Sequence, residues 1–433
     1  MCVLKATGGA TLEGMELFFL ILVLLVATRL FGELAERLGQ PSLIGELVSG
    51  VLLGAIFVQG LGGGMLEVLH ELQESHVFQA LTELGMFFIM LYAGIEMHPK
   101  EVAVHSKSAI MTAVGGMIVP IVLGIALGWY MLPEGEAKLA QSIFIGIALA
   151  VTAVPATVRI LIDLNLLKKK IGQVIVAAAV FDDILSLVLL AWLTGLLGAD
   201  AGLSVAGIAV IAGKVMLFFV VVVPMGHFLF PMIGKHLTKV HVKEFDFSVI
   251  VIIAIAFGLL AHLLGLHLII GAFTAGVFFG PSVVGEKTYE NVRSKVSGVT
   301  FGFFAPLFFA SIGFDLDLSA VIKAPMFVLA LIIVAFIGKL AGAGTGALLS
   351  GLGKRESFAV GVGMSARGAV ELVIAGIALD AGLFDVSSGE SEVSESLFSS
   401  IVIMAVVTTL MVPVLLKWVM SSSAVTWGDQ EDP

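Results

Sequence analysis

Long apolar segments, separated by short polar connections, follow one another along the whole chain. A helix rises 1.5 Å per residue, so about 20 residues cross a hydrocarbon core about 30 Å thick. About 13 segments approach this length, which predicts an all-α polytopic membrane protein. The expected span cores are Met15–Phe31, Leu43–Val58, Leu81–Glu96, Ser108–Met131, Ser142–Leu161, Ile171–Leu197, Leu203–Phe230, Phe245–Leu264, His267–Val283, Thr300–Phe314, Pro325–Leu349, Ser357–Ala381 and Leu397–Trp418.

Basic residues gather in alternate connections. If the N-terminus lies outside, the outside connections hold only Lys138 and Lys323, together with Lys5 in the tail. Cytoplasmic loops are enriched in Lys and Arg, so this asymmetry favours an odd number of spans with the C-terminus in the cytoplasm. The inside connections would carry Arg37, Lys100, Lys107, Lys168, Lys169, Lys170, Lys235, Lys239, Lys243, Lys287, Arg293, Lys295, Lys354, Arg355 and Lys417.

The connections are too short to hold a soluble domain. We therefore expect one transmembrane domain over residues 14–420, between tails at 1–13 and 421–433, with no nucleotide-binding module and no cofactor. The first span should be retained, because Met1 to Glu13 lacks the basic start and cleavage site of a secretory signal. The shortness of the connections favours a bacterial inner membrane.

The composition supports a membrane protein and argues against some other classes. Hydrophobic residues make up 59% of the chain and charged residues 13%, with a mean hydropathy of +1.10. Soluble domains have about a quarter charged residues. The net charge of −10 leaves no basic patch for nucleic acid. Cys2 is the single cysteine, so no disulfide can form within the chain.

The sharpest chemical feature is the sequence Phe181-Asp182-Asp183-Ile184 within the sixth span. A charge near the bilayer centre costs about 2.5–3.5 kcal/mol on insertion scales, so a charge kept there indicates function. Adjacent carboxylates point about 100° apart around a helix, so one can bind a cation while the other faces a different neighbour. Their mutual repulsion favours binding of a proton or a cation. A purely structural role, in salt bridges or hydrogen bonds, is the alternative.

Lys339 lies in the middle of the eleventh span and has no acidic neighbour in sequence. It needs a counter-ion from another helix, and the candidates are Asp182 and Asp183. We consider two roles, proton release from the buried amine or a structural clamp.

Two spans contain signals for a helix break. Thr152-Ala153-Val154-Pro155 interrupts the fifth span, because proline removes a helical hydrogen bond and disfavours helix geometry at Val154. Glycines surround Met364 and Ser365 in the twelfth span. Spans one to six and eight to thirteen form two sets of opposite orientation, and each break falls in the fifth member of its set. Interrupted spans at matching positions point to a transporter site, although ordinary kinks are the alternative.

Arg367 and Glu371 follow the second break at a spacing of four residues, which places them on one helix face. We expect a mainly structural ion pair beside the break.

Together these segments resemble the second branch of the monovalent cation:proton antiporter superfamily, which includes the NapA-type and NhaA-type sodium antiporters and the Kef potassium effluxers. The resemblance covers the whole chain. It rests on the order and spacing of Leu38-Gly39-Gln40-Pro41-Ser42-Leu43-Ile44-Gly45-Glu46, Glu83-Leu84-Gly85-Met86-Phe87, Phe181-Asp182-Asp183, Phe308-Phe309-Ala310-Ser311-Ile312-Gly313, Gly338-Lys339 and Arg367-Gly368-Ala369-Val370-Glu371-Leu372.

The resemblance implies an NhaA-like fold of 13 helices built from inverted repeats. Spans 4–6 and 11–13 would form a core domain with crossed broken helices, and the other spans a dimerisation domain of a homodimer. Asp183 would match the ion- and proton-binding aspartate. Asp182 would match the partner that pairs with Lys339 and releases it when the cation arrives.

The combination of an Asp-Asp pair with this lysine is similar to that of electrogenic sodium antiporters. The resemblance therefore implies exchange of Na⁺ for H⁺, with Li⁺ as a surrogate for Na⁺. Na⁺ would bind ionised Asp183 together with Thr152 and freed backbone carbonyls. Kef-like K⁺/H⁺ exchange is the alternative.

Three other classes are less compatible with the sequence. A cation channel favours a continuous polar path, and an ion-coupled solute symporter needs more hydrogen-bonding groups than the spans contain. An intramembrane aspartyl protease needs two aspartates from different spans facing one water, whereas Asp182 and Asp183 are neighbours on one helix.

Overall fold

The computed structural model describes residues 9–58, 75–97, 106–135, 137–197, 205–237, 242–314, 319–368 and 396–421, together with residues 378, 383 and 393. In these residues all regular structure is helical. Nine of the helices described are long and apolar enough to cross a membrane. The predicted all-α membrane class is confirmed, and the count of 13 spans stays a prediction.

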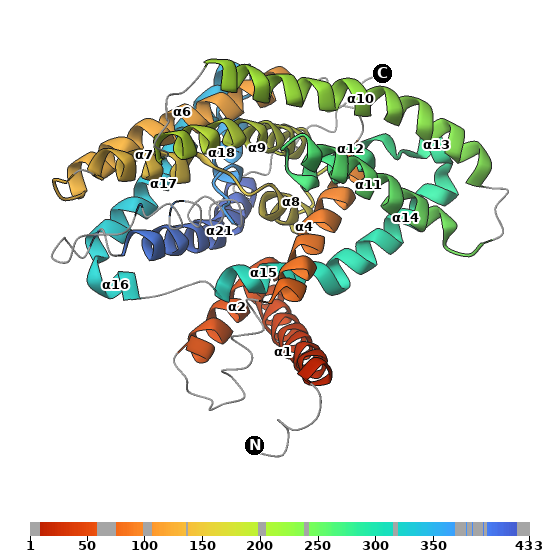
Figure 1. The fold of residues 1–433 in the computed structure, drawn as a ribbon, viewed down its shortest axis with the longest axis horizontal. Coiled ribbons are helices and arrows are strands. Elements are labelled where there is room, and N and C mark those ends of the chain that lie inside the picture. Colours follow the sequence, from red (N-terminus) through yellow and green to blue (C-terminus); the bar gives the residue numbers. More distant parts are fainter. Residues whose placement is uncertain are drawn as a thin grey trace.

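The helices are arranged as Figure 1 shows. Their bounds are α1 (Gly9–Arg37), α2 (Ser42–Val58), α4 (His76–Glu96), α6 (Ser106–Met131), α7 (Lys138–Ala150), α8 (Val154–Asp163), α9 (Lys170–Leu197), α10 (Val205–Leu237), α11 (Phe245–Leu263), α12 (Leu268–Phe278), α13 (Pro281–Val284), α14 (Glu286–Val299), the π-helical turn η2 (Thr300–Phe304), α15 (Ala305–Phe314), α16 (Ser319–Lys323), α17 (Pro325–Leu349), α18 (Lys354–Gly363) and α21 (Leu397–Ser421).

Helix α17 shows how a bilayer sorts side chains. Its large apolar residues Met326, Leu329 and Ile333 are exposed on the surface, whereas Lys339 is fully buried. Apolar side chains can face lipid at no cost, while a charged side chain needs protein partners. The helix therefore turns its one charge inward.

Helices α6 and α17 pack backbone to backbone. A Cβ added at Gly342 would lie 2.2 Å from the Gly115 carbonyl oxygen, and one added at Gly115 would lie 2.3 Å from that of Gly342. Only glycine permits this approach, and small residues are the usual means of close helix packing in membranes. The contact fixes α17, and with it Lys339, against α6.

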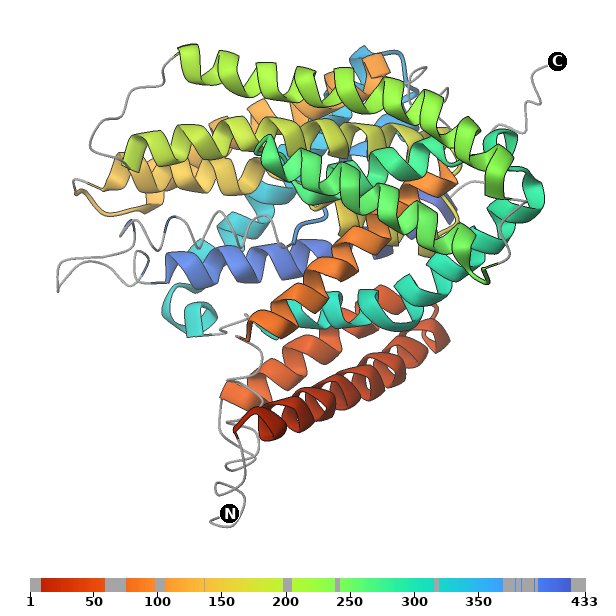
Figure 2. The same ribbon diagram turned by 45° about the vertical axis from the view of Figure 1, so that its right-hand side comes forward.

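The contacts between helices fall into two groups. Helices α6, α7, α9, α17, α18 and α21 pack mainly on one another, and together with α8, which packs on both groups, we call them the site bundle. Helices α1, α2, α4 and α10 to α15 form the flanking bundle. Helix α8 packs against α9 and α21 of its own bundle, and against α2 and α4 of the other. It lies near the centre of the molecule in Figure 1, and Figure 2 shows α1 and α2 along the lower edge of the turned view.

Two of the expected boundaries that differ from the structure have a clear physical reason. The tenth span was expected to begin at Thr300, after a polar connection with Arg293 and Lys295, but helix runs without interruption from Glu286 to Phe314. Its polar first part is an amphipathic helix that buries Tyr289, Val292 and Val296, so its charges reflect one exposed face. The expected span His267–Val283 also ends early, because α12 stops at Phe278 and Pro281 starts the short α13.

Candidate functional site

The fifth span is divided between α7 and α8. Val151 and Ala153 have extended backbone angles, and helix resumes at Val154 with Pro155 in its first turn. Proline suits that position because the first N–H groups of a helix have no intrahelical acceptor. Carbonyls at the end of α7 and N–H groups at the start of α8 therefore have no hydrogen-bond partner within their own helix.

The interruption after α18 crosses this break. Residues 364–368 leave helix geometry after Gly363. The backbone N–H of Ala153 donates to the Ala366 oxygen at 2.9 Å, and the Thr152 hydroxyl donates to the Met364 oxygen at 3.1 Å. The two non-helical segments are thus bonded directly to each other across the site.

Ser365 and Arg367 support the crossing in different ways. The Ser365 hydroxyl donates to the Gly361 oxygen at 2.9 Å, which satisfies one carbonyl at the end of α18. The Arg367 guanidinium donates to the oxygens of Ala148 at 2.8 Å and Leu149 at 2.6 Å. A cation suits this position because the C-terminal end of a helix carries partial negative charge.

The sequence pattern paired Arg367 with Glu371, and Glu371 lies outside the described residues. The backbone N–H of Arg367 donates to the Thr409 hydroxyl at 2.8 Å, and that hydroxyl donates to the Arg367 oxygen at 2.8 Å. Thr409 on α21 was not expected here, since a threonine in an apolar span gives no sequence signal of its own.

Lys339 and Asp182 form an ion pair inside the site bundle. The Lys339 Nζ lies 3.2 Å from Asp182 Oδ2, and both side chains are 0% exposed. The Thr152 hydroxyl lies beside the same carboxylate. One group thus comes from α9, one from α17 and one from the first break. The sequence permits this meeting of three segments but does not predict it.

Asp183 has a different environment from its neighbour. Its side chain is 3% exposed, and among the residues that the structure describes its Oδ2 receives no hydrogen bond. Asp182 pairs with Lys339, whereas Asp183 forms no ion pair among the described residues, and an ionised buried carboxylate without an adjacent cation is strongly disfavoured. A proton or a small cation at Asp183 would neutralise it. Carboxylate, hydroxyl and carbonyl oxygens are also the ligands that hard cations prefer.

A second charged cluster, which the sequence pattern does not predict, lies at the end of α8. The Arg159 guanidinium lies 3.5 Å from Glu46 Oε1 and 3.2 Å from Asp163 Oδ1, and donates to the Ser42 hydroxyl at 2.7 Å. Arg29 lies 3.9 Å from the same Glu46 oxygen. Glu46 belongs to the segment Leu38–Glu46 that carries the family resemblance, but nothing in the sequence singles out Arg159.

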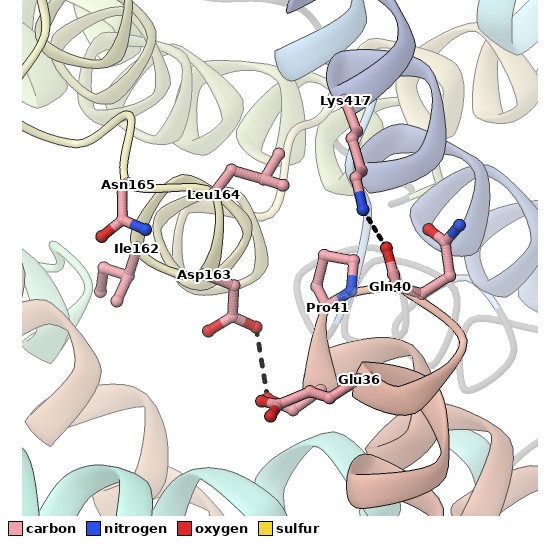
Figure 3. Close-up of a pocket in the computed structure, with 10 residues that line it drawn as sticks. Glu36, Gln40, Pro41, Ile162, Asp163, Leu164, Asn165 and Lys417 are labelled. Atoms are coloured by element: carbon pink, nitrogen blue, oxygen red, sulfur yellow. Dashed lines mark hydrogen bonds between the residues drawn. The ribbon is translucent and has the colours of Figure 1, made fainter. Parts of the chain in front are cut away.

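A cavity of about 520 Å³ opens beside this cluster and is shown in Figure 3. Asp163 and Asn165 line it from the end of α8, Glu36 from the last turn of α1, Gln40 from the turn between α1 and α2, and Lys417 from α21. In Figure 3 the Lys417 side chain reaches toward the α1–α2 turn, where it donates to the Gly39 oxygen. The cavity therefore lies where the two bundles meet.

Among the described residues no group of three or more His, Cys, Asp or Glu could hold a resident metal ion.

A buried carboxylate pair and lysine at crossed broken helices are typical of secondary transporters of small cations. The family model described as "Sodium/hydrogen exchanger, transmembrane" matches residues 20–421. The chain belongs to this family, within the monovalent cation:proton antiporter superfamily. It is therefore an integral membrane cation:proton antiporter.

Several relatives are similar over nearly their whole length. The chain is 33% identical over 405 residues to the Na⁺/H⁺-K⁺ antiporter GerN of Bacillus cereus, which covers 93% of this chain and 96% of that one. It is 29% identical over 427 residues to the high-affinity Na⁺/H⁺ antiporter NhaS3 of Synechocystis sp., covering 92% and 88%. Its fold is similar to that of the sodium proton antiporter MjNhaP1 from Methanocaldococcus jannaschii, with a TM-score of 0.54 and 17% identity over 94% and 96% of the chains.

Proposed function

We propose that the protein exchanges Na⁺, with Li⁺ as a surrogate, for H⁺, and that both ions compete for Asp183. The observation that carries the proposal is the buried Asp183 carboxylate beside the Asp182–Lys339 pair. Names of relatives such as NhaS3 support sodium as the cation.

Competition at one carboxylate supplies the coupling. With Na⁺ bound, Asp183 is ionised, and Thr152 and the carbonyls at the breaks complete the oxygen ligands. With a proton bound, the carboxylate is neutral and the site can return without the cation. In the unloaded, ionised site Asp183 has neither a proton nor a cation beside it, and a buried carboxylate without a partner is costly, so the empty site does not cross and the two ions must alternate.

Exchange is proposed to be electrogenic. Na⁺ beside Asp183 lies one residue from Asp182, so it weakens the attraction that holds Lys339 at 3.2 Å. A lysine released from its carboxylate in a buried place readily loses its proton. One Na⁺ would then replace a proton from Asp183 and a proton from Lys339, and each cycle would move net charge.

Access to the site would alternate by displacement of spans 4–6 and 11–13 against the remaining spans. The sparse contacts between the site bundle and the flanking bundle support this division. We further propose a homodimer in a bacterial inner membrane, with the N-terminus outside, which rests on the family resemblance and on the distribution of Lys and Arg.

K⁺/H⁺ exchange is the second candidate, and the printed name of GerN includes K⁺. Na⁺ and K⁺ use the same oxygen ligands, so cavity size decides between them.

The test is ΔpH-driven transport in proteoliposomes, with proton movement recorded after addition of Na⁺, Li⁺ or K⁺. The wild type should respond to Na⁺ and Li⁺, and Asp183→Asn should abolish the response. Glu134→Gln is the matched control, because Glu134 is an exposed carboxylate that pairs with Lys138 away from the site. A response to K⁺ alone would favour the second candidate, and an undiminished Asp183→Asn response would refute the mechanism.

A further inference from the structure

Two charge contacts join the α8 region to the flanking bundle. Arg159 on α8 meets Glu46 of α2 at 3.5 Å. Lys168, in the turn after α8, meets Glu96 of α4 at 2.8 Å. In both contacts the cation belongs to the site bundle and the carboxylate to the flanking bundle.

The first contact has a substitute partner on each side. Arg159 also contacts Asp163 at 3.2 Å, one turn along its own helix, so this partner would travel with it. Glu46 also contacts Arg29 of α1, which packs on α2 within the flanking bundle. Separation of Arg159 from Glu46 would leave neither buried charge alone.

The second contact is arranged in the same way. Glu96 also pairs with Arg293 of α14, within the flanking bundle, and keeps that partner if Lys168 departs. Lys168 is 62% exposed, so water can replace the carboxylate. Stripping one partner from a buried ion pair is strongly destabilising when the remaining charge has no compensation. Here compensation is present for all four charges.

Two cavities share lining residues at the end of α8. Ile162 and Asn165, at the end of α8, line the 520 Å³ cavity and also a second cavity of about 270 Å³ that Glu96, Lys168 and Arg293 border. A shift of α8 would therefore change the opening at this end of the molecule.

We propose that Arg159–Glu46 and Lys168–Glu96 form a releasable two-point latch between the bundles. The latch stabilises the conformation in which the cavities beside Asn165 are open, and its four members are positioning residues for transport. This inference rests on the proposed alternation between two access states.

Site-directed labelling tests the latch directly. Asn165→Cys is introduced into a Cys2→Ser background, which removes the single native cysteine, and is labelled with a membrane-impermeant maleimide. Glu46→Gln and Lys168→Gln should each move the population away from the latched conformation and lower the labelling rate. For Glu46→Gln we expect on the order of a fivefold decrease, the lower end of usual coupling between sites. For Lys168→Gln the decrease should be smaller, because the lysine is largely exposed.

Arg37→Gln is the matched control, because Arg37 pairs with Glu33 on its own helix and joins no two helices. Its labelling rate should equal that of the background. In exchange assays, Glu46→Gln should change kcat and the KM for Na⁺ by different factors. Arg159→Lys should leave both constants nearer to their wild-type values than Arg159→Gln does. A simple loss of folded protein would lower the apparent kcat alone.

The proposal is overturned if Glu46→Gln and Lys168→Gln label like Arg37→Gln. Lys168→Gln keeps the test decisive if the buried variants fail to fold. Labelling needs no transport, so an absence of Na⁺/H⁺ exchange in the wild type would refute the proposed function without deciding the latch.

Discussion

Removal of the Lys339 ammonium should destabilise the protein through the charge that it leaves behind. Lys339 and Asp182 are both 0% exposed and lie 3.2 Å apart. Breaking a buried pair by removing one partner costs about 3–5 kcal/mol. We therefore expect Lys339→Ala to lower the free energy of unfolding by about this amount. The four tryptophans allow unfolding in detergent to be followed by fluorescence.

A neutral replacement of both partners separates charge from packing. Replacing a buried pair with uncharged side chains of similar size is often neutral for stability. Asp182→Asn combined with Lys339→Leu should therefore recover most of the loss, although it should not exchange ions. Lys323→Ala, at an exposed lysine on α16, is the control and should unfold like the wild type. If Lys339→Ala were as stable as that control, the buried pair would have no energetic role and the reasoning would be wrong.

Three other substitutions test the framework around the site. Gly342→Ala places a methyl group 2.2 Å from the Gly115 oxygen and should cost about 1–3 kcal/mol of unfolding free energy, whereas Gly213→Ala, with open space around it, should cost nothing. Thr152→Val removes the hydroxyl that reaches Met364 and the Asp182 carboxylate, so the KM for Na⁺ should rise about tenfold, equivalent to about 1.4 kcal/mol, in the exchange assay. Arg367→Lys loses the forked contact with the carbonyls at the end of α7, so thermal unfolding should begin at a lower temperature, and an unchanged transition would contradict the capping role.

Sequence pattern and physical chemistry predict much of the fold. The length of the apolar segments identifies seven spans, because the bilayer imposes one thickness on each helix. Most ends of these helices lie within a few residues of the expected positions; the helices are α1, α2, α4, α6, α11, α17 and α21. Pro155 marks the place where α8 begins, since the first helical turn accepts proline without losing a hydrogen bond. Proline alone does not fix a helix start, because Pro120 and Pro413 lie inside α6 and α21. The amphipathic α14 was missed because its polar face resembles a loop when composition alone is considered.

The candidate site is predictable in its residue types but not in its contacts. Asp182, Asp183 and Lys339 stand out because a charge within an apolar span is costly. The Arg159–Glu46 contact joins residues 113 positions apart, and no local pattern shows which helices pack together. The carbonyl partners of Arg367 arise only where the two breaks cross, so they follow from the fold and not from spacing along the chain.

The central claim is that one carboxylate, Asp183, binds either Na⁺ or a proton. Proton release from the purified protein in a weakly buffered detergent solution tests it most directly, because it needs no membrane and no gradient. Addition of Na⁺ should release protons from the wild type and from Glu134→Gln, with less release as the starting pH rises and the site is already deprotonated. Asp183→Asn should release none. Equal proton release from Asp183→Asn and the wild type would contradict the account.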